Sequence, residues 1–178
     1  MLEFNLINNL ILSIICAYGC LSKNKEEKGN KKFFLRIKDI ISIYLFLFYF
    51  VDTMECLFLS KNYYIVPHHL VAIIISIYTL ANDYSSIEIY NFCVVLFLLE
   101  ITSFMLNCRK LMIKENMIDI NYETGFLSIY TIIRSLIFPY FLYNFCGSKK
   151  EILVSGSLIF AMSVYHIILW FKKYGKRY

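Results

Sequence analysis

Long apolar runs alternate with short polar connections along the whole chain. Six such runs hold about 18–21 residues each, the length that a helix needs to cross a bilayer. The runs do not alternate between polar and apolar residues with a period of two, as the strands of a membrane barrel would. The pattern therefore predicts an all-α membrane bundle of about six transmembrane helices. The predicted spans are Phe4–Leu21, Ile40–Leu59, Ile65–Asn82, Ile87–Asn107, Phe126–Phe145 and Ile152–Phe171.

The composition agrees with this pattern. Of 178 residues, 59% are hydrophobic and only 17% are charged, whereas roughly 25% are charged in soluble domains. A chain of this size cannot hide so much apolar surface from water, so the surplus is expected to face lipid. We expect one transmembrane domain over residues 1–178, with a basic loop at 22–39, a polar loop at 108–125 and a basic tail at 172–178.

The charges and cysteines indicate membrane lipids as partners and no cofactor. The net charge of +5 comes mainly from basic residues in the short connections, where such residues help to orient helices in a membrane. No folded basic face for nucleic acid is expected. The six cysteines form no CxxC pair and no zinc spacing with histidine, so we expect no metal site. The sequence is compatible with a chain that acts alone or within a homo- or hetero-oligomer.

Several ionisable residues lie inside the predicted spans, among them Asp52, Glu100, Arg134 and His166. A charge at the centre of a bilayer costs roughly 2.5–3.5 kcal/mol on insertion scales, so each is a candidate for a functional role. We expect these side chains to face a shared interior in which Arg134 pairs with Glu100 or Asp52. The alternative is structural, because a buried ion pair can simply fix the register of two helices.

Two smaller polar residues, Ser103 and Asn107, lie three and seven positions after Glu100 and so share its helix face. Together with Arg134 and His166 they form a candidate polar cluster that binds lipid. The alternative is that these side chains only join neighbouring helices, as small and polar residues often do in membranes.

The adjacent histidines His68 and His69 are the sharpest feature of the sequence. They follow Pro67 at the start of the third apolar run, where proline is tolerated because its missing N–H would have had no partner. A helix from Pro67 to Asn82 spans about 24 Å at 1.5 Å per residue, less than the hydrocarbon core of about 30 Å. Neighbouring helical residues point about 100° apart, so we expect one ring to face the interior and the other to be held by a neighbouring helix.

A neutral imidazole at this helix start is suited to act as a general base or a nucleophile. The positive end of the helix dipole disfavours the imidazolium form there. Glu100 or Asp52 is expected to orient the imidazole, as a carboxylate does in a catalytic triad. We therefore name His68, His69, Glu100 and Asp52 as candidate catalytic residues.

The stretches FYFVDTMECLF, IVPHHLVAIII, LLEITSFMLNCRKLM and YTIIRSLIFPY resemble, in this order, the TLC-domain family of lipid-handling membrane proteins. The resemblance spans nearly the whole chain. It aligns His68 and His69 with the family's histidine pair. It also aligns the E-x-S-T-x-x-x-N-x-R stretch of the non-synthase branch with Glu100, Ser103, Asn107 and Arg109, although the order here is Thr-Ser and phenylalanine replaces the usual proline. The H-D-x-S-D motif of the ceramide synthases is missing between the histidine pair and Glu100.

The resemblance implies six helices around a lipid-accessible cavity, in a protein of the endoplasmic reticulum. Our first hypothesis is a TLC-type protein that acts in lipid homeostasis by binding, sensing or moving membrane lipids. The second is a ceramide-synthase-like acyltransferase that uses the His68–His69 pair, with acyl-CoA as co-substrate. A trafficking receptor or a small channel is a third alternative, for which the C-terminal tail offers little support.

Overall fold

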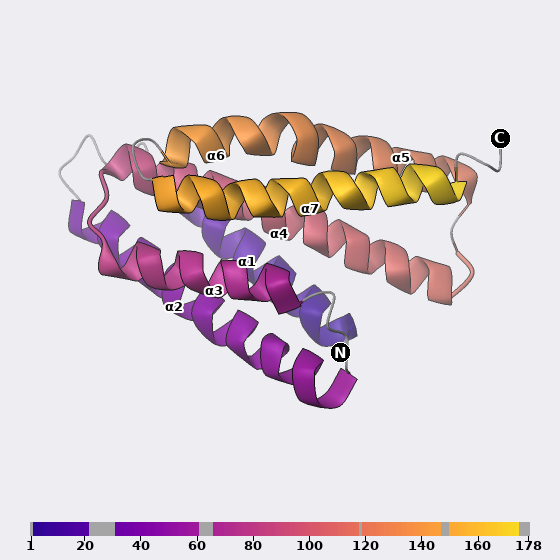
Figure 1. The fold of residues 1–178 in the computed structure, drawn as a ribbon, viewed down its shortest axis with the longest axis horizontal. Helices are drawn as coiled ribbons and strands as arrows, with labels where there is room; N and C mark the ends of the chain where they lie inside the picture. The colour runs from indigo at the N-terminus through magenta and orange to yellow at the C-terminus, as the bar shows by residue number, and fades with distance from the viewer. Residues whose placement is uncertain (1, 22–30, 61–65, 118, 147–149, 175–178) are drawn as a thin grey trace.

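The structure, a computed structural model, describes residues 2–21, 31–60, 66–117, 119–146 and 150–174. Within these ranges the chain is helical apart from short turns and holds no strand, which confirms the all-α prediction. The helices form six rods (Figure 1). The rods are α1 (Leu2–Leu21), α2 (Lys31–Glu55) with the π-turn η2 (Cys56–Ser60), α3 (Val66–Ala81), α4 (Ser86–Lys114), α5 (Ile120–Ile132) with η3 (Ile133–Ile137) and α6 (Phe138–Cys146), and α7 (Lys150–Tyr174).

Successive rods run in opposite directions, so the bundle is built up and down (Figure 1). The start of α1 and the end of α7 lie at the same end of the bundle, which we call the terminal end (Figure 1). The rods pack mainly as α1 on α4, α2 on α3, and α6 on α4 and α7. Helix α4 is therefore the central element against which both halves of the chain are assembled.

Three helices are long and apolar enough to cross a membrane, whereas the sequence pattern predicts six. They are Leu35–Leu59, Ser86–Lys114 and Asn121–Asn144. The described chain also has three shorter apolar helices, Asn5–Leu21, Val66–Ala81 and Gly156–Lys172. Large apolar side chains are exposed on all of these rods, among them Ile14, Phe58, Ile74, Leu136 and Val154. The outer surface thus carries the apolar surplus that the composition indicates.

The predicted basic loop at 22–39 is wrong in extent, because residues 31–39 form the first turns of α2. Residues 22–30 lie outside the described residues. Lysine and arginine are good helix formers, and Lys38 is buried against the turn between α3 and α4. Its Nζ donates to the carbonyl oxygen of Asn82 at 3.0 Å and lies 5.5 Å from the centre of the Tyr84 ring. These contacts extend α2 beyond its apolar run.

The predicted polar loop at 108–125 is reduced to a short turn, because α4 and α5 extend into it from both sides. Within the turn Asn116 has φ 54°, a left-handed conformation that asparagine tolerates. The Asp119 carboxylate then caps the first turn of α5 by accepting a backbone N–H at 3.0 Å. The predicted basic tail also begins within a helix, since α7 ends at Tyr174. Residues 175–178 lie outside the described residues.

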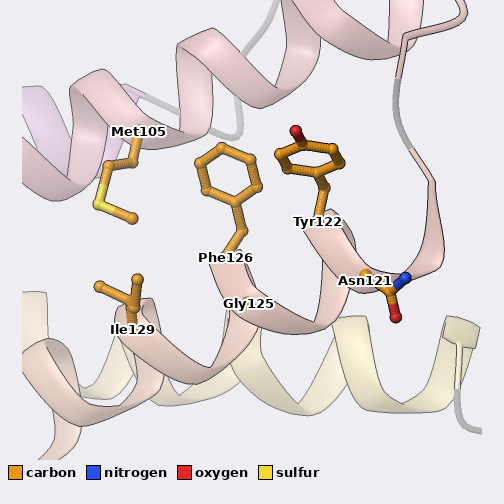
Figure 2. Close-up of a pocket in the computed structure, with 6 residues that line it drawn as sticks. All are labelled: Met105, Asn121, Tyr122, Gly125, Phe126 and Ile129. Atoms are coloured by element: carbon orange, nitrogen blue, oxygen red, sulfur yellow. The ribbon is translucent and has the colours of Figure 1, made fainter.

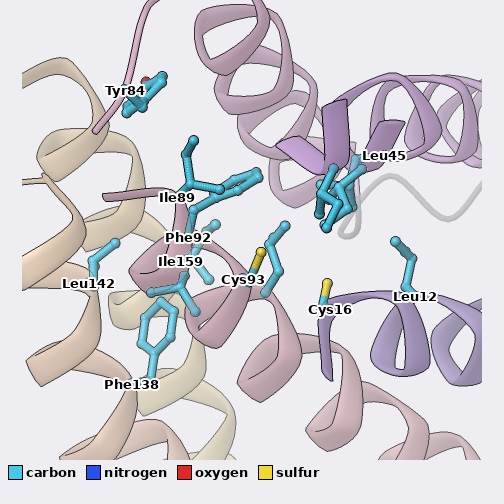
Figure 3. Close-up of a cluster of buried hydrophobic side chains, with 14 of the residues drawn as sticks. Leu12, Cys16, Leu45, Tyr84, Ile89, Phe92, Cys93, Phe138, Leu142 and Ile159 are labelled. Atoms are coloured by element: carbon cyan, nitrogen blue, oxygen red, sulfur yellow. The ribbon is translucent and has the colours of Figure 1, made fainter. Parts of the chain in front are cut away.

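The core fills the space between α1, α2, α4, α6 and α7 (Figure 3). Phe92 and Phe138 are its largest fully buried apolar side chains. Cys16 and Cys93 are also fully buried in it, as the sequence predicts for cysteines that serve as small apolar side chains. The labelled members of the cluster are Leu12, Cys16, Leu45, Tyr84, Ile89, Phe92, Cys93, Phe138, Leu142 and Ile159.

Two glycines allow close helix contacts around this core. A Cβ added to Gly19 of α1 would lie 2.7 Å from the Cys93 Sγ, and one added to Gly156 of α7 would lie 2.4 Å from the Leu142 Cδ1. Both distances are shorter than van der Waals contact. The absence of a side chain at these positions therefore sets how closely α1 approaches α4 and α7 approaches α6.

Candidate functional site

Three interior cavities share His68 and Ser103 among their lining residues. We call them the Asp52 cavity (about 170 Å³), the His166 cavity (about 160 Å³) and the Glu100 cavity (about 30 Å³) after one lining residue of each. Each of the eight candidate residues predicted from the sequence lines at least one of these cavities, and together they come from α2, α3, α4, η3 and α7. The bundle therefore brings the residues singled out in the sequence to one group of adjoining cavities.

His69, in the first turn of α3, is held by Asp52 of α2. The imidazole Nε2 lies 3.2 Å from a carboxylate oxygen of Asp52, and both side chains are buried. The other ring nitrogen, Nδ1, is also buried and has no hydrogen-bond partner among the described residues. His69 thus anchors the start of α3 to α2 and offers a substrate no accessible nitrogen.

His68, its neighbour, faces the three cavities. Its ring is edge-on to Tyr49, with 6.1 Å between the ring centres, and lies 5.8 Å from the ring of His69. Among the described residues it makes no hydrogen bond or ion pair. The division that the sequence predicts for the histidine pair is therefore present, with His68 as the ring that faces the interior.

Glu100, near the middle of α4, is fully buried and both of its carboxylate oxygens accept hydrogen bonds. The Tyr49 hydroxyl donates to Oε1 at 2.9 Å, and the Asn9 side-chain amide donates to Oε2. The Asn9 Oδ1 in turn accepts a hydrogen bond from Asn107 at 3.0 Å. This chain of amides directs its donors toward Glu100, so α1, α2 and α4 are joined by one polar network.

Glu100 orients no histidine in this arrangement. The sequence prediction that Glu100 or Asp52 holds an imidazole is therefore met by Asp52 alone. Asn107, predicted as a member of the lipid-binding cluster, belongs to the network that holds Glu100 and also lines the Asp52 cavity.

Arg134 is only 4% exposed, yet it makes no ion pair with any described residue. Its Nε donates to the Thr102 hydroxyl at 2.7 Å, and its Nη2 donates to the carbonyl oxygen of Leu99 at 3.0 Å. Longer hydrogen bonds join Nη1 to Ser163 at 3.3 Å and Nη2 to Ser103 at 3.4 Å. The predicted pairing of Arg134 with Glu100 or Asp52 is wrong, because these carboxylates are bonded to other partners and neutral oxygens surround the guanidinium.

The backbone around Arg134 is widened into the π-turn η3, in which the Phe138 N–H bonds to the Ile133 carbonyl oxygen. Pro139 follows directly after this turn. A proline ring clashes with the carbonyl group four residues earlier in a regular helix, and a π-turn is a common way to absorb such a disturbance. The proline therefore helps to set the position from which Arg134 reaches the cavities.

His166 of α7 is exposed on one side and lines the His166 cavity on the other, together with His68, Ser103, Tyr130 and Arg134. Its ring centre lies 6.2 Å from that of Tyr165. It makes no hydrogen bond to another described residue. His166 is thus a side chain that a ligand can approach.

A second polar cluster ties α4, α5 and α7 together at the terminal end. The Arg109 Nε donates to Glu123 at 2.7 Å, and its guanidinium lies 4.3 Å from the Trp170 ring centre. The Trp170 indole N–H donates to the same carboxylate at 2.8 Å. These contacts join three helices through one carboxylate, so we interpret the role of this cluster as structural.

An apolar groove of about 340 Å³ lies between α4 and α5. Figure 2 shows Met105 of α4 facing Phe126 and Ile129 of α5 across it. The remaining lining residues are Asn121, Tyr122 and Gly125. None of the lining residues is ionisable at neutral pH, so the groove offers dispersion contacts to an apolar chain.

Sequence reasoning did not identify Asn9, Tyr49, Thr102 and Ser163, which hold the two buried charges. Asn9 carried a usable signal, because it is a second consecutive asparagine inside an apolar run. The hydroxyl residues carried none, since serine and threonine are common in such runs. Within the described residues no group of three histidine, cysteine, aspartate or glutamate side chains is placed to hold a metal ion.

The sequence and the structure were also compared with known proteins. The chain matches no protein-family model, no curated protein and no solved structure.

Proposed function

We propose that this chain is an integral membrane protein of the TLC type, closer to the non-synthase branch, that acts in lipid homeostasis by binding, sensing or moving membrane lipids. In this proposal all six rods cross the bilayer around a lipid-accessible interior, with α3 as the shortest span. The observation that carries it is the group of adjoining cavities that share His68 and Ser103, inside a bundle with many large apolar side chains on its outer surface.

Such an arrangement suits an amphipathic ligand. Hydrogen-bonding side chains in the Asp52 and His166 cavities can hold a headgroup that would otherwise lie in water. The groove beside Phe126 offers apolar surface for an acyl chain. Ionisable groups inside a membrane cost free energy, and they are usually found where they serve a function. Their presence here favours a role for the interior beyond helix packing.

Lipid analysis of cells that express the chain tests this proposal. Wild type is expected to change the composition of membrane lipids, and His68→Ala at the same protein level is expected to lose that change. Ser157→Ala is the matched control, because Ser157 is exposed on α7 and donates only to the Leu153 carbonyl oxygen. A wild-type chain without effect, or a His68→Ala variant that retains the full effect, contradicts the proposal.

The proposed location is the endoplasmic reticulum, and this part rests on the family resemblance alone. Fluorescence microscopy of a tagged full-length chain against markers of the endoplasmic reticulum and the plasma membrane tests it. Staining of the plasma membrane only would contradict it.

The second candidate function is an acyl-CoA-dependent acyltransferase, favoured by the His68 imidazole that faces the cavities without a hydrogen bond. In this reaction His68 takes the proton from an amine or hydroxyl group of the acceptor lipid, whose nitrogen or oxygen attacks the thioester carbonyl carbon. The carbon–sulfur bond breaks, and the proton passes from the imidazole to the departing CoA thiolate. His69, fixed by Asp52, holds the first turn of α3 in place.

Transfer of a labelled acyl group from acyl-CoA to lipid by membranes that contain the chain distinguishes the two functions. His68→Ala is expected to abolish transfer, whereas His69→Ala is expected to lower it through misplacement of α3. Wild-type membranes that change cellular lipids but transfer no acyl group contradict the enzyme and leave lipid binding in place.

A further inference from the structure

We propose that the His166 cavity binds the phosphate group of a membrane phospholipid, with Arg134 as the residue that recognises it. This inference rests on the proposed role in lipid binding and names the class of lipid. It follows from the charge of the cavity, from the hydrogen bonds of the guanidinium and from the positions of the two imidazoles.

The lining of the His166 cavity is electropositive. It contains Arg134 together with His68 and His166, and no aspartate or glutamate. Burial of a cation in an apolar bundle without a counter-ion is unfavourable. An anion that enters the cavity supplies the missing negative charge, so binding is favoured by the neutralisation of Arg134.

Glu100 makes no ion pair and no hydrogen bond with Arg134. It lines the Glu100 cavity together with Arg134 but does not line the His166 cavity, and its two oxygens accept hydrogen bonds from Tyr49 and Asn9. The structure therefore holds the two charges on separate partners, which leaves the side of Arg134 that faces the His166 cavity for a ligand.

The guanidinium is fixed firmly on one side and loosely on the other. Its short hydrogen bonds go to the Thr102 hydroxyl and to the Leu99 carbonyl oxygen, two residues that do not line the His166 cavity. The bonds to Ser163 and Ser103, which line the cavity, are longer at 3.3 and 3.4 Å. An arginine has five N–H donors, so one Nη1 donor has no acceptor among the described residues. This free donor and the weakly used ones form the fork that suits a phosphate.

The serines indicate where the anion sits. The Ser103 hydroxyl donates to the carbonyl oxygen of Leu99, and that of Ser163 donates to the carbonyl oxygen of Ile159. A hydroxyl has one proton to donate, so both serines present only lone pairs, which repel an anion. The imidazoles of His68 and His166 each carry an N–H in the neutral form. The phosphate is therefore expected between the Arg134 fork and these rings, where N–H donors come from three side chains.

Binding measurements on the purified full-length chain in detergent micelles test the proposal. The probes are phosphatidic acid, diacylglycerol with the same acyl chains, and inorganic phosphate, and native mass spectrometry reads the bound fraction. Wild type is expected to prefer phosphatidic acid over diacylglycerol at least about tenfold, because a charge-assisted hydrogen bond contributes that much to binding. Arg134→Lys, which keeps the charge but loses the fork, is expected to weaken phosphatidic acid binding by about 10- to 100-fold.

Two further variants make the test independent of the folding of Arg134→Lys. His166→Ala alters an exposed side chain and is expected to lower phosphatidic acid binding about tenfold with diacylglycerol binding unchanged. Lys114→Gln removes an exposed positive charge at the end of α4 and is expected to change neither. Thermal unfolding in the same micelles confirms that His166→Ala and Lys114→Gln are folded.

The outcomes separate this inference from the proposed function. Equal binding of phosphatidic acid and diacylglycerol, or full phosphatidic acid binding by His166→Ala, overturns the phosphate site and leaves lipid binding in place. Binding of neither lipid overturns both. If inorganic phosphate displaces phosphatidic acid at equal concentration, the site takes a free phosphate, and the assignment to a lipid fails.

Discussion

Replacement of Asn9 by leucine tests whether the buried Glu100 network holds the bundle together. Asn9 donates to one Glu100 oxygen and accepts from Asn107 at 3.0 Å, so the substitution removes two hydrogen bonds between α1 and α4. Leucine has a similar volume and leaves the apolar contacts of α1 largely intact. The perturbation is therefore confined to the polar network.

The expected cost in the free energy of unfolding is about 2–4 kcal/mol. A hydrogen bond to a charged group contributes about 1.5–3 kcal/mol, and one between neutral side chains within a membrane contributes about 0.6 kcal/mol. Glu100 is 1% exposed, so water cannot replace the lost donor. Tyr49 retains its bond to the other carboxylate oxygen, which is why we expect a loss of stability and not complete unfolding.

Equilibrium unfolding of the purified chain in mixed micelles measures this cost. Asn144→Leu is the matched control, because Asn144 is exposed and bonds only to the Tyr140 carbonyl oxygen, so its effect should stay within about 0.5 kcal/mol. A double-mutant cycle with Glu100→Gln isolates the pair, and coupling of at least about 1 kcal/mol is expected. A cost of Asn9→Leu below about 1 kcal/mol, or no coupling to Glu100→Gln, would refute the reasoning.

Three further substitutions probe other contacts of the bundle by thermal or denaturant unfolding. Gly156→Ala places a Cβ 2.4 Å from a Leu142 methyl carbon and should lower the free energy of unfolding by about 1–3 kcal/mol. Leu142→Ala in the same chain should reduce this loss, and additive effects of the two substitutions would count against close packing of α6 and α7. Trp170→Phe removes the indole donor to Glu123 at 2.8 Å and should cost about 1.5–3 kcal/mol, and an unchanged midpoint would contradict the clamp. Thr102→Val, nearly equal in shape, removes the shortest acceptor of the Arg134 guanidinium and should cost a similar amount, unless Arg134 finds another oxygen.

The apolar pattern predicted the helices well and their ends poorly. Six apolar runs correspond to the six rods, since a run of apolar residues identifies the part of a helix that avoids water. The predicted helix ends were wrong where charged residues continue a helix, as in the first turns of α2. There Lys38 donates to a carbonyl oxygen of the turn between α3 and α4. Apolar periodicity does not register such a contact.

For the candidate site, the sequence predicted the residues but not their partners. The sequence identified His68, His69, Asp52 and Arg134 as out of place in an apolar run, and the 100° step between neighbouring helical residues predicted that the two histidines face different surroundings. The partner of each group was beyond reach of this reasoning. Opposite charge alone favoured a pair between Arg134 and a carboxylate, whereas the structure gives Arg134 hydroxyl and carbonyl oxygens.

The sequence by itself determined that this protein is helical, strongly apolar and provided with a few ionisable groups at fixed places along its helices, because propensity and hydrophobicity are local properties of the chain. Only the tertiary structure decided that His69 meets Asp52, that Glu100 is held by Asn9 and Tyr49, and that Arg134 faces a cavity without a counter-ion. These pairings depend on the rotation and depth of each helix against its neighbours. Contacts between residues up to 98 positions apart set the rotation and depth of the helices, and side-chain packing selects among the many pairings that charge and periodicity allow.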